Sequence, residues 1–307
     1  MQPSLIVHGG AGDWSPADDD GDAVVAGCRA AARAGFAILR GGGSVLDAVT
    51  AAVSVLEDDP LFNAGTGSAL TADGEVECDA SLMCGDGRAG AVGALRDVKN
   101  PIRLARLVME QTPHVLLVGA GARAFAAEQG IEALPPGVLV TARMRAKWQA
   151  ALAHRAGSLS GGTVGCVARD AAGRLAAATS TGGMMLKRSG RLGDSAVIGA
   201  GTYADDAAGA VSGTGIGEAF IKAAAAKQTV EAMRGGRSPS DAAREILPMV
   251  RRYGGDGGLI CVDAAGRIGL AFDAPRMAHA WIDAAGQEGS GFRGRQGRVP
   301  ATTDPVV

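Results

Sequence analysis

A threonine at the start of a strand-like run is the first residue of this sequence that could do unusual chemistry. The run 162–167 (GTVGCV) follows a segment of small residues, 156–161. If the Gly162–Thr163 bond were cut, the free α-amine of Thr163 would lie beside its own hydroxyl. Such an amine titrates near about 8, so part of it is neutral at pH 7 and can take the hydroxyl proton. Thr163 is therefore a candidate nucleophile and Gly162–Thr163 a candidate cleavage site, although threonine is also common at strand starts.

Further motifs of small, hydroxyl-bearing and charged residues follow Thr163. They are the runs 178–183 (ATSTGG), 190–195 (GRLGDS), 199–206 (GAGTYADD) and 211–218 (VSGTGIGE). Thr214 and Gly215 could offer a hydroxyl and a backbone N–H to an oxyanion, just before a helix that begins near residue 217. Acyl transfer needs such donors, but the same residues would also suit an ordinary turn from strand to helix.

Arg191 and Asp194 lie three residues apart in a glycine-flanked loop. The guanidinium fork of an arginine can hold an α-carboxylate through two parallel hydrogen bonds, and a carboxylate can take an α-ammonium. Together the two side chains could hold an amino acid. As a surface ion pair they would contribute almost nothing to stability.

The order and spacing of these motifs resemble the plant-type asparaginase and isoaspartyl peptidase family of N-terminal nucleophile hydrolases. The amino-terminal half agrees through the segments 8–12 (HGGAG), 61–65 (LFNAG), 79–83 (DASLM), 98–102 (VKNPI) and 112–115 (TPHV). The resemblance runs from about His8 to Trp281. It implies an α+β fold in which two mainly antiparallel sheets lie between helix layers, as a four-layer αββα sandwich.

The resemblance also implies what individual residues do. A single domain, residues 1–307, would cut itself into fragments 1–162 and 163–307. Thr163 would then attack the substrate, with its own amine as base. Thr181 would orient Thr163, and Thr214 with Gly215 would form the oxyanion hole. Arg191 and Asp194 would bind the aspartyl moiety of the substrate. A loop containing Asn63 would approach the catalytic threonine.

The segment 56–66 (LEDDPLFNAGT) resembles the family's sodium-binding loop, which coordinates the ion through backbone carbonyls. The residues that would take part are Leu56, Glu57, Asp59, Phe62, Ala64 and Thr66. A solvated acidic turn would have the same side chains. No cofactor is expected for the reaction itself.

The implied reaction is the hydrolysis of β-aspartyl amides, namely isoaspartyl dipeptides and L-asparagine, through an acyl-enzyme. Two alternatives stay open: a glycosylasparaginase-like hydrolase, and an unprocessed member of the fold that binds small molecules. The chain departs from the family pattern at Leu186, where many relatives have Asn, at Cys84, where Asp is frequent, and at Asp273-Ala274, where Asn-Thr is frequent. These departures bear on substrate preference and maturation rate.

Two other enzyme classes fit the sequence less well. A strand-like run, 114–118, continues into 119–124 (GAGARA), which imitates a dinucleotide fingerprint, but no acidic residue follows the next strand-like run, 138–140. The segment 8–12 is similar to the oxyanion loop of esterases, but the sequence contains no G-x-S-x-G elbow.

The elements that must position these residues can be predicted from periodicity and turn residues. One helix is expected over 24–39, a second is expected to start at the Ser44–Asp47 capping box, and a third at Asn100-Pro101. A fourth is expected to start at residue 238 and to kink or end at Pro248. Strands are expected over 76–83, 91–95 and 114–118. Hairpins are expected for 163–168 with 175–179 and for 258–262 with 268–272, and a loose tail from about residue 287.

Composition fits one enzyme-sized unit. Of 307 residues, 47% are hydrophobic and only 4% aromatic, and 48 glycines are more than twice the average share of about 7%. The net charge of −2 gives no electrostatic case for binding nucleic acid or an anionic membrane. No run approaches the roughly 20 apolar residues of a membrane span.

Compartment and assembly follow from the same sequence. The strand-like run 4–7 begins almost at the first residue given, so no signal peptide is expected. Five cysteines at unpatterned spacing predict buried thiols in a reducing compartment, so a cytoplasmic location is expected. The family resemblance implies small-molecule substrates and a dimer of cleaved αβ heterodimers.

Overall fold

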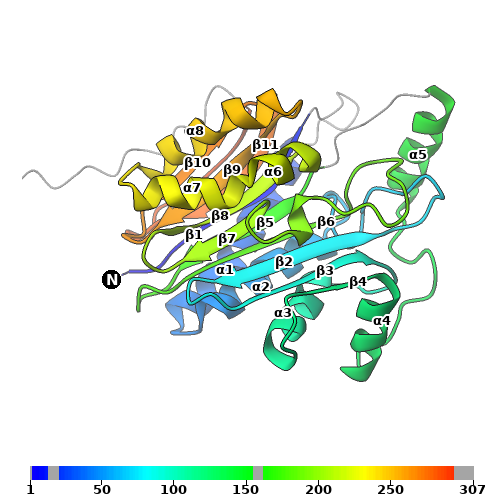
Figure 1. Cartoon of the computed structure of the whole chain (residues 1–307), viewed down its shortest axis with the longest axis horizontal. Coiled ribbons are helices and arrows are strands. Elements are labelled where there is room, and N and C mark those ends of the chain that lie inside the picture. The colour runs from blue at the N-terminus through cyan, green and yellow to red at the C-terminus, as the bar shows by residue number, and fades with distance from the viewer. Residues whose placement is uncertain (1, 13–20, 155–161, 294–307) are drawn as a thin grey trace, which may run out of the picture.

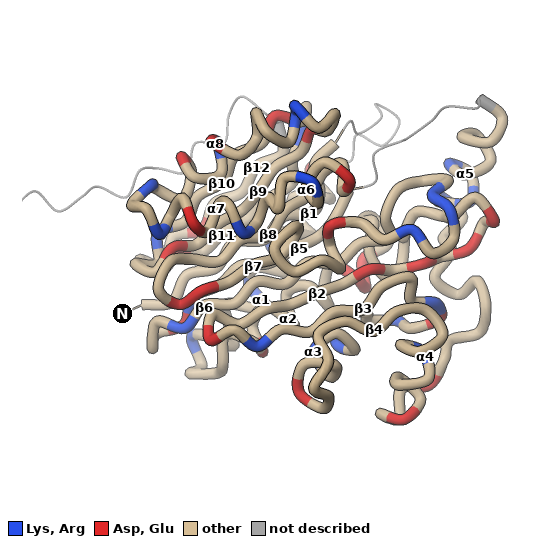
Figure 2. The backbone as a smooth tube through the Cα atoms, in the orientation of Figure 1, with Lys and Arg blue, Asp and Glu red and all other residues tan. Residues whose placement is uncertain are grey.

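The structure is a computed structural model, and it describes residues 2–12, 21–154 and 162–293. Within these ranges the chain forms a mixed α/β fold built on two β-sheets with helices packed against them (Figure 1). Figure 2 shows acidic and basic residues interspersed along the described chain. No helix in these ranges is long and apolar enough to cross a membrane.

The larger sheet has eight strands and carries the region around residue 163 at its centre. Its spatial order is β12 (Glu288–Arg293), β11 (Arg276–Ile282), β1 (Ser4–Gly12), β5 (Val164–Arg169), β6 (Leu175–Thr181), β2 (Cys78–Cys84), β3 (Ala89–Leu95) and β4 (Leu116–Val118). Neighbouring strands are antiparallel except β3 and β4. The burial of every residue in β1, β5 and β6 places these strands inside the molecule.

The smaller sheet has four antiparallel strands in the order β10 (Ile268–Phe272), β9 (Gly257–Asp263), β8 (Gly209–Gly215) and β7 (Thr202–Asp205). It faces the larger sheet, with β8 against β5 and β6 and β9 against β1. Apolar side chains from both sheets, among them Ile6, Val167, Ala177, Val262 and Ile260, form a common core between them. Residues that lie on facing strands at the end of this core can therefore meet.

Helices cover the two sheets from outside. Helices α1 (Gly21–Arg40), α2 (Val45–Asp58) and α3 (Pro101–Gln111) pack on the larger sheet, where α4 (Gly119–Glu128) contacts β3 and β4. Helices α6 (Gly217–Ala223), α7 (Ala225–Arg234) and α8 (Pro239–Arg252) form a core with the smaller sheet. Helix α5 (Ala142–His154) lies at one end of the molecule (Figure 1), where Trp148 donates to the Thr71 carbonyl at 2.9 Å.

Most expected elements are confirmed, including both hairpins. Ser44 caps α2 by accepting from the Asp47 N–H at 3.1 Å, and Pro101 occupies the first turn of α3. Two expectations are wrong. Helix α8 does not end at Pro248 but runs on to Arg252, with Leu247 and Val250 buried in the core. Pro248 and Arg244, whose carbonyl loses its N–H partner, are exposed to water. A kink at Pro248, the other outcome expected there, stays a prediction.

The carboxyl-terminal end of the described chain is more ordered than expected. The loose tail predicted from about residue 287 does not begin there, because Glu288–Arg293 form β12 and pair with β11. Glycines at 289 and 291 let the strand lie close to the rings of Trp281 and His279, which is a packing reason that the glycine-rich sequence concealed. Residues 294–307 lie outside the described part of the chain.

Candidate active site

Thr163 lies immediately before β5, between the two sheets, with only 4% of its surface exposed. Its hydroxyl donates to Thr181 Oγ1 at 3.3 Å, and its N–H donates to Thr214 Oγ1 at 3.3 Å. The two partners come from β6 of the larger sheet and β8 of the smaller one. The structure thus brings together three hydroxyls that the sequence places up to 51 residues apart.

The carbonyl of Gly162, on the other side of the same peptide bond, is held by two donors. Asn63 Nδ2 donates to it at 2.7 Å and Thr181 Oγ1 at 3.4 Å. The amide of Asn63 is itself fixed, since its Oδ1 accepts from the Ala69 N–H at 2.6 Å and its Nδ2 also donates to the Gly183 carbonyl at 2.7 Å. Asn63, expected near the catalytic threonine, therefore lies on the carbonyl of the bond proposed for cleavage.

The segment 8–12 also packs against Gly162, Thr163 and Thr214. His8 Nδ1 lies 2.9 Å from the Thr163 carbonyl oxygen, and the Ala11 N–H donates to Thr214 Oγ1 at 3.0 Å. Gly10, at φ +111°, approaches Gly162 so closely that a Cβ would lie 2.6 Å from the Gly162 Cα. In the sequence these residues contributed to the family resemblance and to the rejected esterase reading, and no individual role was assigned to them. The glycine run at the end of a strand was the signal for a close backbone approach.

Thr214 and Gly215 lie at the end of β8. Thr214 Oγ1 accepts from the N–H groups of Thr163 and Ala11, so the hydrogen of its own hydroxyl must point elsewhere. Gly215 pairs with Gly257, and a Cβ at residue 215 would lie 2.2 Å from the Asp256 carbonyl oxygen. Only glycine fits there. This geometry suits a pair of donors to a developing oxyanion.

Arg191 forms a two-bond ion pair that the sequence did not reveal. Its Nε and Nη2 donate to the two carboxylate oxygens of Glu218 at 2.8 and 2.7 Å. Glu218 lies in the first turn of α6, 27 residues further along the chain. The pair uses one edge of the guanidinium fork and leaves the Nη1 side for another anion.

Asp194 lies in a short 3₁₀ turn and is 3% exposed. Its Oδ2 has no hydrogen-bond partner within the described part of the chain. Burial raises the pKa of this carboxyl to about 7, although the positive charge of Arg191 acts in the opposite direction. A Cβ at Gly217 would lie 2.8 Å from Asp194 Oδ1 and 3.0 Å from Arg191 Nη2, so only glycine fits beside both groups without crowding them.

The loop expected to bind sodium closes on itself through its backbone. The Glu57 carbonyl accepts from the Thr66 N–H at 2.8 Å, and Pro60 has no N–H to give to the Leu56 carbonyl four residues earlier. Burial raises the pKa of the Glu57 carboxyl to about 8, and this group accepts from Ser180 Oγ at 2.6 Å. Across the described ranges no group of three His, Cys, Asp or Glu side chains could hold a metal, so any cation here would depend on carbonyl oxygens.

The residues that depart from the family pattern do not form the site, and Cys84 pairs with Ala176, at the end of β2 away from the Asp79–Thr181 pair. Leu186 adopts φ +60°, a left-handed conformation that Asn tolerates better than Leu. Asp273 accepts from the Gly257 N–H at 3.0 Å, and Gly257 is the partner of Gly215 across the sheet. Cys84 is buried at the end of β2.

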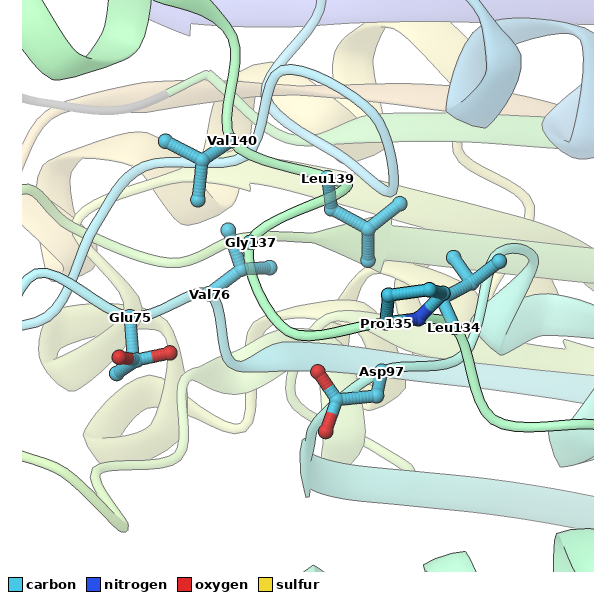
Figure 3. Close-up of a pocket in the computed structure, with 8 residues that line it drawn as sticks. All are labelled: Glu75, Val76, Asp97, Leu134, Pro135, Gly137, Leu139 and Val140. Carbon is cyan, nitrogen blue, oxygen red and sulfur yellow. The ribbon is translucent and has the colours of Figure 1, made fainter.

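Other features that the sequence suggested lie elsewhere. The run 119–124 begins α4 beside β4, a short strand at the edge of the larger sheet. A small pocket shown in Figure 3 is lined by residues of three segments, none of them in the site: Glu75, Val76, Asp97, Leu134, Pro135, Gly137, Leu139 and Val140. The only chemistry that this pocket offers is the carboxylates of Glu75 and Asp97.

The sequence matches the protein family described as Asparaginase over residues 1–290. A Xenopus laevis protein named isoaspartyl peptidase/L-asparaginase is 45% identical over 289 residues, which cover 92% of this chain and 93% of the relative. A human protein of the same name is 46% identical over 273 residues, or 87% and 88% of the two chains. An isoaspartyl peptidase from Salmonella typhimurium is 45% identical over 294 residues, or 90% and 94%. The chain therefore belongs to the asparaginase family.

Proposed function

We propose that the chain cuts itself between Gly162 and Thr163 and then hydrolyses β-aspartyl amides, as an isoaspartyl peptidase and L-asparaginase. One observation carries the proposal: the Gly162 carbonyl accepts from Asn63 Nδ2 while the Thr163 hydroxyl contacts Thr181. The names of the relatives, isoaspartyl peptidase and isoaspartyl peptidase/L-asparaginase, support the reaction. The bond to be cut and its nucleophile are thus held together before any substrate binds.

Self-cleavage would proceed by an N-to-O acyl shift. Thr163 Oγ1 attacks the Gly162 carbonyl carbon, and the negative charge that develops on the oxygen is stabilised by Asn63 Nδ2 and Thr181 Oγ1. The C–N bond then breaks, and the proton lost by the hydroxyl ends on the new amine. Water hydrolyses the resulting ester, which restores the hydroxyl and leaves Gly162 as a carboxylate.

Substrate hydrolysis would use the same hydroxyl. The substrate α-carboxylate binds Arg191 and its α-ammonium binds Asp194, whose buried Oδ2 has no other partner in the described ranges. This grip places the β-carbonyl at Thr163, with its oxygen toward Thr214 and Gly215. The Thr163 amine takes the hydroxyl proton and gives it to the leaving amine. Water then releases aspartate from the acyl-enzyme.

Three further parts of the proposal follow the family. Helices on the outer faces of two facing sheets support a four-layer αββα sandwich. Backbone carbonyls at Leu56, Glu57, Asp59, Phe62, Ala64 and Thr66 would hold a sodium ion, which would brace the loop that presents Asn63 without entering the reaction. The mature enzyme would be a dimer of cleaved αβ heterodimers.

The test is a side-by-side assay of purified mature protein on β-Asp-Leu, L-asparagine, α-Asp-Leu and a glycosylated asparagine. We expect turnover of the first two and none of α-Asp-Leu, which has no free α-carboxylate on its aspartyl residue and so loses the Arg191 contact. Comparable turnover of α-Asp-Leu would contradict the grip by Arg191 and Asp194. Preference for the glycosylated substrate would favour the glycosylasparaginase alternative, and an uncut, inactive chain would favour the binding alternative.

A further inference from the structure

His8 lies beside the nucleophile but takes no part in the steps described above. The ladder between β1 and β5 ends at the pair His8–Gly165, and β1 then bulges between His8 and Gly10. The Thr163 carbonyl lies just beyond this ladder, and His8 Nδ1 lies 2.9 Å from its oxygen. A buried side chain therefore binds the carbonyl of the nucleophilic residue where the sheet no longer does.

The surroundings of His8 determine which ring nitrogen carries the proton. A carbonyl oxygen can only accept, so Nδ1 must carry hydrogen. Burial lowers the pKa of His8 to about 3 despite the hydrogen bond to Thr163, so the ring is neutral at pH 7 and Nε2 is bare. Nε2 lies 3.0 Å from Ser212 Oγ. The Ser212 hydroxyl must therefore donate to the ring.

Ser212 is the first of four buried hydroxyls that form a continuous chain, which we call the hydroxyl relay. With its hydrogen on His8, Ser212 accepts from Thr179 at 2.7 Å, a shorter contact than the 3.3 Å from Thr179 Oγ1 to the Gly201 carbonyl oxygen. Thr202 donates to Thr179 at 2.5 Å, and Ser81 donates to Thr202 at 2.9 Å. Each hydroxyl has one hydrogen, so every donor in the relay points toward His8, and aligned hydrogen bonds strengthen one another.

The relay passes back and forth between the two sheets. Ser212 and Thr202 face each other across β8 and β7 of the smaller sheet. Thr179 and Ser81 face each other across β6 and β2 of the larger sheet. Gly165 leaves room for it, because a Cβ there would lie 2.0 Å from Ser212 Oγ and 2.5 Å from His8 Nε2. Both sheets therefore fix the orientation of one imidazole ring.

We propose that His8, held as the Nδ1–H tautomer by the hydroxyl relay, is a positioning residue that keeps Thr163 in its reactive orientation once the chain is cut. The inference rests on the proposed self-cleavage. Before the cut Thr163 is held by the chain on both sides. Afterwards its amino side is free, and the peptide plane after it is fixed by the hydrogen bond from His8 to its carbonyl. The loss of this bond should lower kcat rather than raise KM, because Arg191 and Asp194 still hold the substrate.

The tautomer can be measured without any assay of activity. The chain has four histidines, so ¹⁵N-histidine labelling with assignment through His8→Asn identifies the His8 nitrogens. We expect a protonated Nδ1 and a bare Nε2, unchanged between about pH 5 and pH 8. A protonated Nε2, or titration of His8 within this range, would overturn the proposal. The measurement can also be made on uncut Thr163→Ala protein.

The positioning role needs a kinetic comparison per mature active site with β-Asp-Leu. His8→Asn keeps an N–H donor where Nδ1 lies, whereas His8→Leu removes it. We expect His8→Leu to lower kcat by about 100-fold with little change in KM, and His8→Asn to recover most of the loss. Ser4→Ala is a matched control, since Ser4 is a buried residue of β1 whose hydroxyl has no partner among the described residues.

Normal kcat in His8→Leu, or equal losses in the Asn and Leu variants, would contradict the positioning role. If His8→Leu does not fold or mature, the Asn variant and the tautomer still decide the question, because both use folded protein. If the wild-type protein does not hydrolyse β-Asp-Leu, the proposed function fails. In that case the positioning role falls with it, whereas the tautomer result stands by itself.

Discussion

Asn63 donates to the carbonyl oxygen of Gly162 at 2.7 Å, across 99 residues of sequence. This contact places a fixed amide N–H on the peptide bond that precedes the candidate nucleophile. In the proposed self-cleavage it would give the precursor its own oxyanion donor, separate from the Thr214 and Gly215 donors proposed for the substrate. Maturation and turnover should therefore respond differently to substitutions at the two places.

Asn63→Ala should slow self-cleavage by about 100-fold or more, which is the usual effect of removing one oxyanion donor. The rate can be followed on denaturing gels after rapid purification. Asn63→Asp is the matched control, because it keeps the oxygen that accepts from the Ala69 N–H but loses the donor to Gly162. Normal cleavage in Asn63→Asp would show that the amide N–H is not needed.

Arg191→Lys should raise KM for L-asparagine and leave self-cleavage unchanged, since the precursor has no free α-carboxylate. A lysine ammonium cannot hold Glu218 and a substrate carboxylate through separate edges, and the loss of a charged bidentate contact corresponds to about 2 kcal/mol, or roughly 30-fold in KM. Arg188→Lys, at an exposed position in the same loop, is the control. A normal KM in Arg191→Lys would place the carboxylate elsewhere.

The pH dependence should separate Asp194 from the Thr163 amine. In the free enzyme the Asp194 carboxyl has a pKa raised to about 7 by burial, so kcat/KM should fall as the pH drops through 7 and this group becomes neutral. A bound substrate ammonium keeps Asp194 ionised, so kcat should not show the decrease that Asp194 causes in kcat/KM. The pH dependence of kcat should instead follow the pKa of the Thr163 amine. A kcat profile that falls with the same pKa as kcat/KM would count against this assignment.

The buried Asp194 carboxylate, which is proposed to bind the substrate, should lower the stability of the folded protein at neutral and higher pH. Its folded-state pKa lies above its unfolded value, so the folded protein binds more protons and loses stability as the pH rises from about 4 to 7. Asp194→Asn should therefore unfold at a higher urea concentration than the parent chain at pH 8, and the difference should shrink near pH 4. These measurements suit the uncut Thr163→Ala background, where one chain unfolds. An Asn variant that is less stable at pH 8 would contradict the burial argument.

Ala224, between α6 and α7, has φ +45° and is exposed. Ala224→Gly should stabilise the protein by about 1 kcal/mol, because a Cβ is unfavourable in the left-handed region. Ala232→Gly, inside α7, should have the opposite effect of similar size. Urea unfolding of both variants measures the signs, and a destabilised Ala224→Gly would contradict the assigned backbone conformation.

Local patterns predicted the parts of the site that depend on short-range structure. The hairpin of β5 and β6 pairs Val164 with Ser180, and this register brings Thr163 next to Thr181. Glycine-rich strand ends indicated Thr214 and Gly215. The pairing of Arg191 with Glu218 could not be read from spacing, because it depends on where α6 begins relative to a loop.

Other features depended on contacts between strands that are far apart in the sequence, within one sheet or between the two. His8 and Thr163 are 155 residues apart and meet only because β1 and β5 are neighbours in the sheet. The four relay hydroxyls lie in motifs that carry the family resemblance, but nothing in their spacing shows that they contact one another. The helix end expected at Pro248 was wrong because Pro248 is exposed and the turns around it stay packed on the core. The loose tail expected from residue 287 was wrong because the glycines of β12 pack closely on aromatic rings.

The central claim is that Thr163 is the residue at which the chain cuts itself and the residue that attacks substrate. Intact-mass measurement of freshly purified protein tests it most directly, with wild type, Thr163→Ala and Thr163→Ser in parallel. The wild type should give fragments 1–162 and 163–307, the Ala variant one uncut and inactive chain, and the Ser variant the same two fragments at a lower rate. An uncut wild type that hydrolyses β-Asp-Leu, or an Ala variant cut at the same bond, would contradict the claim.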